Sequence, residues 1–416
     1  MTAFQILGLL LTLSAAFAYV NFRWIRLPTA IGLMAMALSA SVALIVVDGV
    51  GWLHLKGPVT VVLDRISFGE TLLHGLLGAL LFAGSLHIDL AQMRKELGAI
   101  VVLAIVSTLL STFAIGALLY VVLGAVAIPL PLGHCLLFGA IIAPTDPVGV
   151  LGILKAARIP KSLEIQIAGE SLFNDGVGVV VFVAISGIVT HHETLSVSAI
   201  ATAFVHEALG GIAFGLVTGY VAYRLLKSID HYQTELLITL ALVVGGYAAA
   251  EHLGISAPLA SVASGLLIGN QGRARAMSDV TRDHLDKFWM LVDEILNTIL
   301  FVLVGFELIR LSLSSSAILA GVLAVPISLV CRLGSVALPI ALLRRWIAFV
   351  PGAVAVLTWG GLRGGISVAL ALALAPSPER NVVVVMTYSV VVFSVLVQGL
   401  TLGKVARRFV GNAAST

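Results

Sequence analysis

Apolar residues fill most of the chain in long segments that are separated by short polar connections. A helix needs about 20 mostly apolar residues to cross a bilayer. We count about thirteen segments of roughly this length, with the approximate bounds 3–22, 28–48, 70–89, 97–126, 132–155, 163–190, 200–226, 235–252, 255–270, 291–311, 317–343, 351–375 and 382–403. The pattern therefore predicts an all-α polytopic membrane protein with about 13 transmembrane helices.

Composition leads to the same class. The chain has 416 residues, of which 59% are hydrophobic and 11% are charged, whereas soluble domains carry about 25% charged residues. We expect the lipid bilayer as its surroundings and no nucleic-acid partner. The two cysteines, Cys135 and Cys331, lie inside apolar segments and are expected to be buried small side chains. The first segment is expected to stay as a span, because no positive residue precedes it.

The positions of lysine and arginine predict the topology. Eighteen of the 24 basic residues follow odd-numbered spans, and four follow even-numbered spans. The positive-inside rule then places the N-terminus outside and the C-terminus in the cytoplasm. The longest polar connection, 271–290, holds four of these residues and is expected to be a solvated interfacial segment.

Two of the predicted spans are interrupted. In the fifth, Pro144 and Pro147 lack amide hydrogens and would free the carbonyls of Ala140 and Ala143. In the twelfth, four glycines in the run 359–365 loosen the helix. The interruptions lie seven spans apart, so their spans cross in opposite directions. Paired broken helices in two inverted halves are typical of the substrate site of a secondary transporter.

Five ionisable residues are expected deep in the spans: Asp146, Glu170, Asp175, Arg332 and Arg363. Each uncompensated charge would cost about 2.5–3.5 kcal/mol on insertion scales. Three acids against two arginines leave one negative charge, which one monovalent cation or one proton would cancel. Arg332 is the expected structural partner of Glu170, and Arg363 is expected to offset the carboxylates and helix ends at the break.

Spacing groups these residues further. Ser171 and Asp175 are four apart and share a helix face, and Glu170 and Asn174 share the neighbouring face. Thr145 and Asp146 offer the same hydroxyl and carboxylate chemistry from the broken span. Such oxygen ligands suit a hard cation, with Asp146, Asp175, Ser171 and Thr145 as the expected ligands. Because a cation and a proton compete for a buried carboxylate, such a site can exchange one for the other.

The run Pro144 to Pro147, the run Glu170 to Asp175 and the run Gly360 to Gly364 together resemble the NhaP-like sodium/proton antiporters, a family that includes the animal sodium/hydrogen exchangers. The resemblance covers nearly all of the spans. It implies a homodimer in a plasma membrane, with a core domain at 97–190 plus 317–403. An interface domain at 1–96 plus 235–311 and a linker span at 200–226 complete the expected organisation.

The resemblance also implies ion contact by Asp146, Asp175, Ser171 and the backbone of Thr145, and a pair between Glu170 and Arg332. Asn followed by Asp, at positions 174 and 175, implies electroneutral one-for-one exchange. One departure is that some relatives place an acid on the third span, where this chain has Leu81 to Gly84.

We therefore expect an antiporter, not an enzyme, that exchanges Na+ or Li+ for H+ by alternating access and needs no cofactor. Exchange of K+ for H+ stays open, because both ions accept the same ligands. An intramembrane aspartyl protease is disfavoured, since two-carboxylate catalysis gives no reason for broken inverted helices. An ion channel is disfavoured too, because its filter is normally shared by several subunits.

Overall fold

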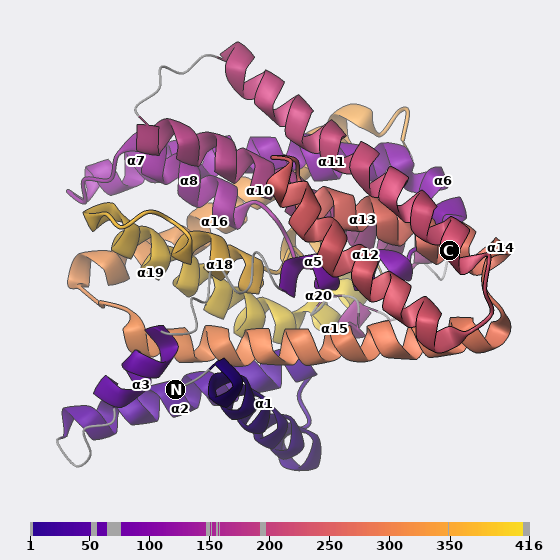
Figure 1. The fold of residues 1–416 in the computed structure, drawn as a ribbon. Helices are drawn as coiled ribbons and strands as arrows, with labels where there is room; N and C mark the ends of the chain where they lie inside the picture. The colour runs from indigo at the N-terminus through magenta and orange to yellow at the C-terminus, as the bar shows by residue number, and fades with distance from the viewer. Residues whose placement is uncertain are drawn as a thin grey trace.

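The computed structural model describes residues 3–50, 56–64, 76–146, 150, 152–154, 157, 159–191, 197–347 and 349–410. Within these ranges every regular element is a helix (Figure 1). In chain order the α-helices are α1 Ala3–Val20, α2 Thr29–Gly49, α3 Lys56–Asp64, α5 Leu77–Leu86, α6 Leu90–Val101, α7 Thr108–Ala125, α8 Leu132–Ile142, α10 Lys161–His191, α11 Val197–Leu226, α12 Tyr232–His252, α13 Ala257–Leu267, α14 Arg273–Arg275, α15 Asp279–Glu307, α16 Ser315–Leu343, α17 Ala353–Trp359, α18 Gly365–Leu372, α19 Pro378–Phe393 and α20 Gly399–Phe409.

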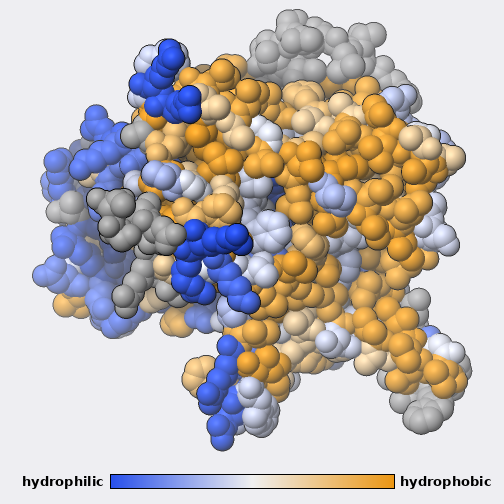
Figure 2. Space-filling view, turned by 180° about the vertical axis from the view of Figure 1, so that it is seen from behind, coloured by the Kyte–Doolittle hydropathy of each residue, from blue (hydrophilic) through white to orange (hydrophobic). Residues whose placement is uncertain are grey.

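The helices confirm the predicted fold class. In the described part of the chain, nine helical segments are long and apolar enough to cross a membrane. The other four predicted spans contain the shorter helices α5, α8, α13 and the pair α17 and α18. Apolar side chains cover most of the face seen in Figure 2, and hydrophilic ones gather at one edge. Large apolar residues such as Val217 and Val322 are more than half exposed, as expected for side chains that face lipid.

Most of residues 271–290 is helical and continues into the tenth span. Helix α15 begins at Asp279 and runs without a break to Glu307, so the polar connection and the tenth span share one helix. Ser278 caps it by accepting a hydrogen bond from the amide of Thr281 at 3.3 Å. Asp279, Asp283 and Lys287 lie on an exposed face of its first turns. The other face is buried at Trp289, whose indole nitrogen donates to the Thr239 hydroxyl at 3.1 Å.

The fourth span is also longer than its apolar pattern predicts. The helical segment runs from Leu90 to Ala125, through α6, a π-helical turn and α7. Asp89 explains the early start, because its carboxylate accepts hydrogen bonds from the amides of Ala91 and Gln92. Helix α3 was not predicted at all.

Two hydrophobic cores contain parts of the interrupted helices. The first is built from α7, α8, α10, α16, α18 and α19. The second joins α1, α2 and α15 to α18 and α19. In Figure 1, α15 runs across the lower part of the molecule, and α1, α2 and α3 lie below it. Helix α8 thus belongs to the first core, and α18 contributes to both.

Candidate functional site

The two interrupted spans meet through their non-helical segments. Helix α8 ends at Ile142, and the chain from Ala143 to Asp146 is not helical. Helices α17 and α18 are separated by residues 360–364. The amide of Asp146 donates to the carbonyl of Leu362 at 2.8 Å, which ties one break to the other. Both predicted interruptions are present, although Pro147 lies outside the described residues.

Gly364 stands where no side chain fits. A Cβ atom there would collide with the carboxylate of Asp146. We expect Gly364→Ala to displace that carboxylate and to lower the maximal rate of the cation/proton exchange predicted from the sequence at least about tenfold, which corresponds to about 1.4 kcal/mol. Gly245→Ala is the matched control, since a Cβ atom there meets nothing within 4 Å. Equal rates in the two variants, measured in vesicles at equal protein content, would contradict this placement.

The side chain of Arg363 extends from the second interrupted span to the first. Its guanidinium is 3% exposed and donates from Nη1 to the carbonyls of Ala143 and Pro144, at 2.5 Å each. These carbonyls lie at the negative C-terminal end of α8. Its backbone amide donates to the hydroxyl of Ser394 at 2.9 Å. Arg363 therefore occupies the position that the sequence suggested, with a cation beside the freed carbonyl of Ala143.

Side chains of α10 form hydrogen bonds with both the hydroxyl and the backbone amide of Thr145. Its hydroxyl lies 2.9 Å from the hydroxyl of Ser171 and accepts from the amide nitrogen of Asn174 at 2.8 Å. Its backbone amide donates to the side-chain oxygen of Asn174 at 3.2 Å. Asn174 is fully buried and uses both ends of its amide on this one residue. The side chains of Thr145, Ser171 and Asn174 thus form one network across the two elements.

Glu170 and Arg332 form the ion pair that the sequence suggested. Arg332 Nη1 lies 2.6 Å from Glu170 Oε1, and both side chains are 2–3% exposed. Arg332 Nη2 also donates to the carbonyl of Leu357 at 3.2 Å, near the end of α17. The pair therefore links α10, α16 and the first half of the broken twelfth span.

Asp146 and Asp175 open into a common cavity of about 350 Å³. Asp175 is 3% exposed, and Asp146 is partly exposed. Helix α5 contributes Leu81, Ala83 and Gly84 to the wall and no carboxylate. The described residues of α5 therefore bring no acidic side chain to this cavity. With the hydroxyl groups of Thr145 and Ser171 nearby, the oxygens present here suit an alkali cation or a proton.

Two further residues of this cavity, Asp293 and Asn297 on α15, were not predicted from the sequence. Asn297 Nδ2 donates to the Asp293 carboxylate at 3.1 Å. Their spacing of four in a helix was a usable signal. The predicted tenth span begins at 291, which leaves Asp293 at its end.

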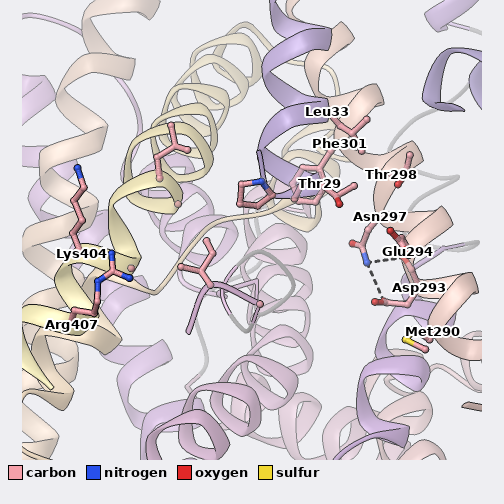
Figure 3. Close-up of a pocket in the computed structure, with 17 residues that line it drawn as sticks. Thr29, Leu33, Met290, Asp293, Glu294, Asn297, Thr298, Phe301, Lys404 and Arg407 are labelled. Atoms are coloured by element: carbon pink, nitrogen blue, oxygen red, sulfur yellow. Dashed lines mark hydrogen bonds between the residues drawn. The ribbon is translucent and has the colours of Figure 1, made fainter. Parts of the chain in front are cut away.

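A larger cavity of about 730 Å³ lies next to the first and is drawn in Figure 3. It is lined by the N-terminal end of α2, by α15 and by α20. Met290, Asp293 and Asn297 line both cavities. In Figure 3 the acidic residues project from α15 on one wall, and Lys404 and Arg407 stand on the opposite wall.

Comparison with known proteins supplies independent information. The family model described as sodium/hydrogen exchanger, transmembrane, matches residues 10–408. The Na(+)/H(+) antiporter NhaP of Pseudomonas aeruginosa is 48% identical over 402 residues, which cover 96% of this chain and 95% of that protein. The Na(+)/H(+) antiporter NhaH of Halobacillus dabanensis is 33% identical and covers 80% of this chain and 82% of its own length.

The fold has a solved counterpart. The structure of the sodium proton antiporter MjNhaP1 from Methanocaldococcus jannaschii matches with a TM-score of 0.77 at 19% identity. The match covers 98% of this chain and 99% of that chain. At this identity the likeness shows the fold alone.

Proposed function

Because this chain belongs to the sodium/hydrogen exchanger family, we propose that it is a secondary antiporter that exchanges Na+ for H+ across the plasma membrane. The observation that carries the proposal is the pair of carboxylates, Asp146 and Asp175, facing one cavity at the crossing of two broken helices. Crossed broken helices at the middle of a bundle are the usual substrate site of a secondary transporter.

The proposed cation ligands are Asp146, Asp175, Ser171 and Thr145. Asp175 is the main proton acceptor, because it is the more deeply buried of the two acids. Na+ and a proton cannot both occupy its carboxylate, so loading one displaces the other. Asn174 and Thr145 keep the helix break in place through their reciprocal hydrogen bonds.

Exchange is proposed to be electroneutral, with one proton for each sodium ion. Asn174 is neutral and its amide is engaged by Thr145, so it adds no titrating group beside Asp175. Among the five charged residues that the sequence places deep in the spans, two arginines oppose three acids, which leaves one charge for the transported ion to cancel. Asp293, which also lines the cavity, is not part of this count.

Transport is proposed to proceed by movement of a core domain, 97–190 plus 317–403, against an interface domain, 1–96 plus 235–311. The large cavity supports this division, since α2 and α15 form one wall and α20 forms the other. The linker span is 200–226. A homodimer with its N-terminus outside and its C-terminus in the cytoplasm completes the proposal, and the distribution of lysine and arginine supports that orientation.

The ion preference is tested by a competition between cations. The relatives compared above carry the name Na(+)/H(+) antiporter, which supports sodium and gives no support to K+/H+ exchange. We expect proteoliposomes with an internal pH dye to respond to a sodium or lithium gradient at least about tenfold faster than to an equal potassium gradient, a preference of about 1.4 kcal/mol. Equal responses to Na+ and K+ would overturn the sodium assignment, and no response to any of the three ions would overturn antiport itself.

A further inference from the structure

Asp293 and Asn297 occupy the boundary between the two cavities. They lie one turn apart on α15, and Figure 3 shows both side chains on the cavity wall. Asn297 is 7% exposed, and its nitrogen donates to the Asp293 carboxylate at 3.1 Å and to the Asp293 carbonyl at 2.9 Å. The Asn297 bond to Oδ1 fixes the orientation of the carboxylate and leaves Oδ2 for another partner.

A second carboxylate, that of Asp175, lines the smaller cavity together with Asp293. In the described part of the chain, the side chain of Asp175 receives no hydrogen bond, although it is 3% exposed. It shares the smaller cavity with Asp293, and leucine and isoleucine side chains form much of the remaining wall. A buried carboxylate without hydrogen-bond donors is costly unless a cation or a proton compensates it. The cavity is therefore built to receive a cation from the side of Asp293.

The charges that line the larger cavity indicate how a cation would reach Asp175. Lys404 and Arg407 stand on its α20 wall and would repel a cation, whereas Asp293 and Glu294 stand on its α15 wall. Glu294 lines only the larger cavity, and Asp293 lines both. The route that keeps a cation near negative charge therefore follows α15 and passes Asp293 on its way to Asp175.

We propose that Asp293 and Asn297 form a second cation site, which holds a partly hydrated Na+ between the larger cavity and the site at Asp146 and Asp175. The orientation proposed above places the larger cavity on the cytoplasmic side, because Lys404 and Arg407 line it. The inference rests on the proposed antiport function and adds an intermediate binding step to it. The ion is bound by the free oxygen of Asp293, by water, and by the side-chain oxygen of Asn297. It then passes to Asp175 when the proton there leaves.

The first test compares two neighbouring acids. In everted membrane vesicles, which expose the cytoplasmic face, Asp293→Asn is expected to raise the KM for Na+ about tenfold, a change of about 1.4 kcal/mol, with little change in maximal rate. Glu294→Gln removes the same charge from the same larger cavity and is expected to leave the KM within about twofold, or about 0.4 kcal/mol. Asp293→Glu, which restores the carboxylate, is expected to recover most of the wild-type KM.

The outcomes separate this inference from the function on which it rests. If wild type exchanges sodium and Asp293→Asn has an unchanged KM, the second site does not exist. An equal rise in KM for Asp293→Asn and Glu294→Gln means only general attraction by the acidic wall and also overturns it. If wild type moves no protons with sodium, the proposed function fails, and this inference fails with it.

A binding measurement covers the case in which Asp293→Asn does not fold. Purified Asp175→Asn protein is expected to retain weak binding of radioactive 22Na+, and Asn297→Ala added to it is expected to abolish that binding. Retention of the same 22Na+ binding in the double variant would overturn the second site, whatever the transport data show.

Discussion

Asp175→Asn is expected to abolish sodium-driven proton movement while the protein stays folded in the membrane. The substitution keeps the shape of the side chain but removes the negative charge and the titrating proton, so neither ion can be exchanged at that carboxylate. We expect the rate in proteoliposomes to fall at least about 100-fold, or about 2.7 kcal/mol. Elution as a single peak on size exclusion, at the wild-type volume, would show that the loss is not due to unfolding.

A surface acid provides the control for charge removal alone. Asp283 lies on α15, is about half exposed and pairs with Lys287 at 2.6 Å. Asp283→Asn is expected to transport at the wild-type rate, because an exposed ion pair contributes little. Normal exchange by Asp175→Asn would show that Asp175 is not the site where Na+ and H+ compete.

Arg332→Ala is expected to cause the largest loss of stability of any single substitution at the site. It would leave Glu170, which is 2% exposed, as a buried carboxylate without its ion-pair partner. Breaking one side of a buried pair typically costs about 3–5 kcal/mol. The measurement is the midpoint of thermal unfolding in detergent, followed by intrinsic fluorescence, together with the yield of purified protein.

Two further variants make this result interpretable. Arg345→Ala removes an exposed arginine just beyond the end of α16 and is expected to leave the midpoint unchanged. Adding Glu170→Gln to Arg332→Ala removes the stranded charge and is expected to recover a substantial part of the lost stability. A double variant as unstable as Arg332→Ala alone would mean that packing of the arginine, rather than its charge, holds α10 to α16.

The parts of the site that follow from local chemistry could be predicted from the sequence. Pro144 cannot continue the hydrogen bonding of a helix, and the glycines at 360–365 weaken one, so both interruptions are present at those residues. Ser171 and Asp175 share a face because they are four apart in a helix. The pairing of Glu170 with Arg332 followed from the cost of burying either charge alone, and the structure contains that pair at 2.6 Å.

What depends on packing between distant segments could not be predicted in the same way. Helix α15 begins in a stretch whose exposed face is charged, so hydropathy ends the span near Leu291. The Ser278 cap and the burial of Trp289 against Thr239 on α12 show that the helix starts earlier. That displacement put Asp293 at the edge of the predicted span. Its place in the cavity with Asp175 depends on the contact of α15 with α5, which no local pattern contains.

The most direct test of the central claim is to count the protons released when Na+ binds to the purified protein. Titration calorimetry with NaCl, repeated in two buffers of different ionisation enthalpy, gives that number. The account predicts proton release that rises toward one per sodium ion at low pH, and no release in Asp175→Asn. Sodium binding to wild type with the same heat in both buffers at every pH would mean that no proton leaves, and would contradict competition between Na+ and H+ at Asp175.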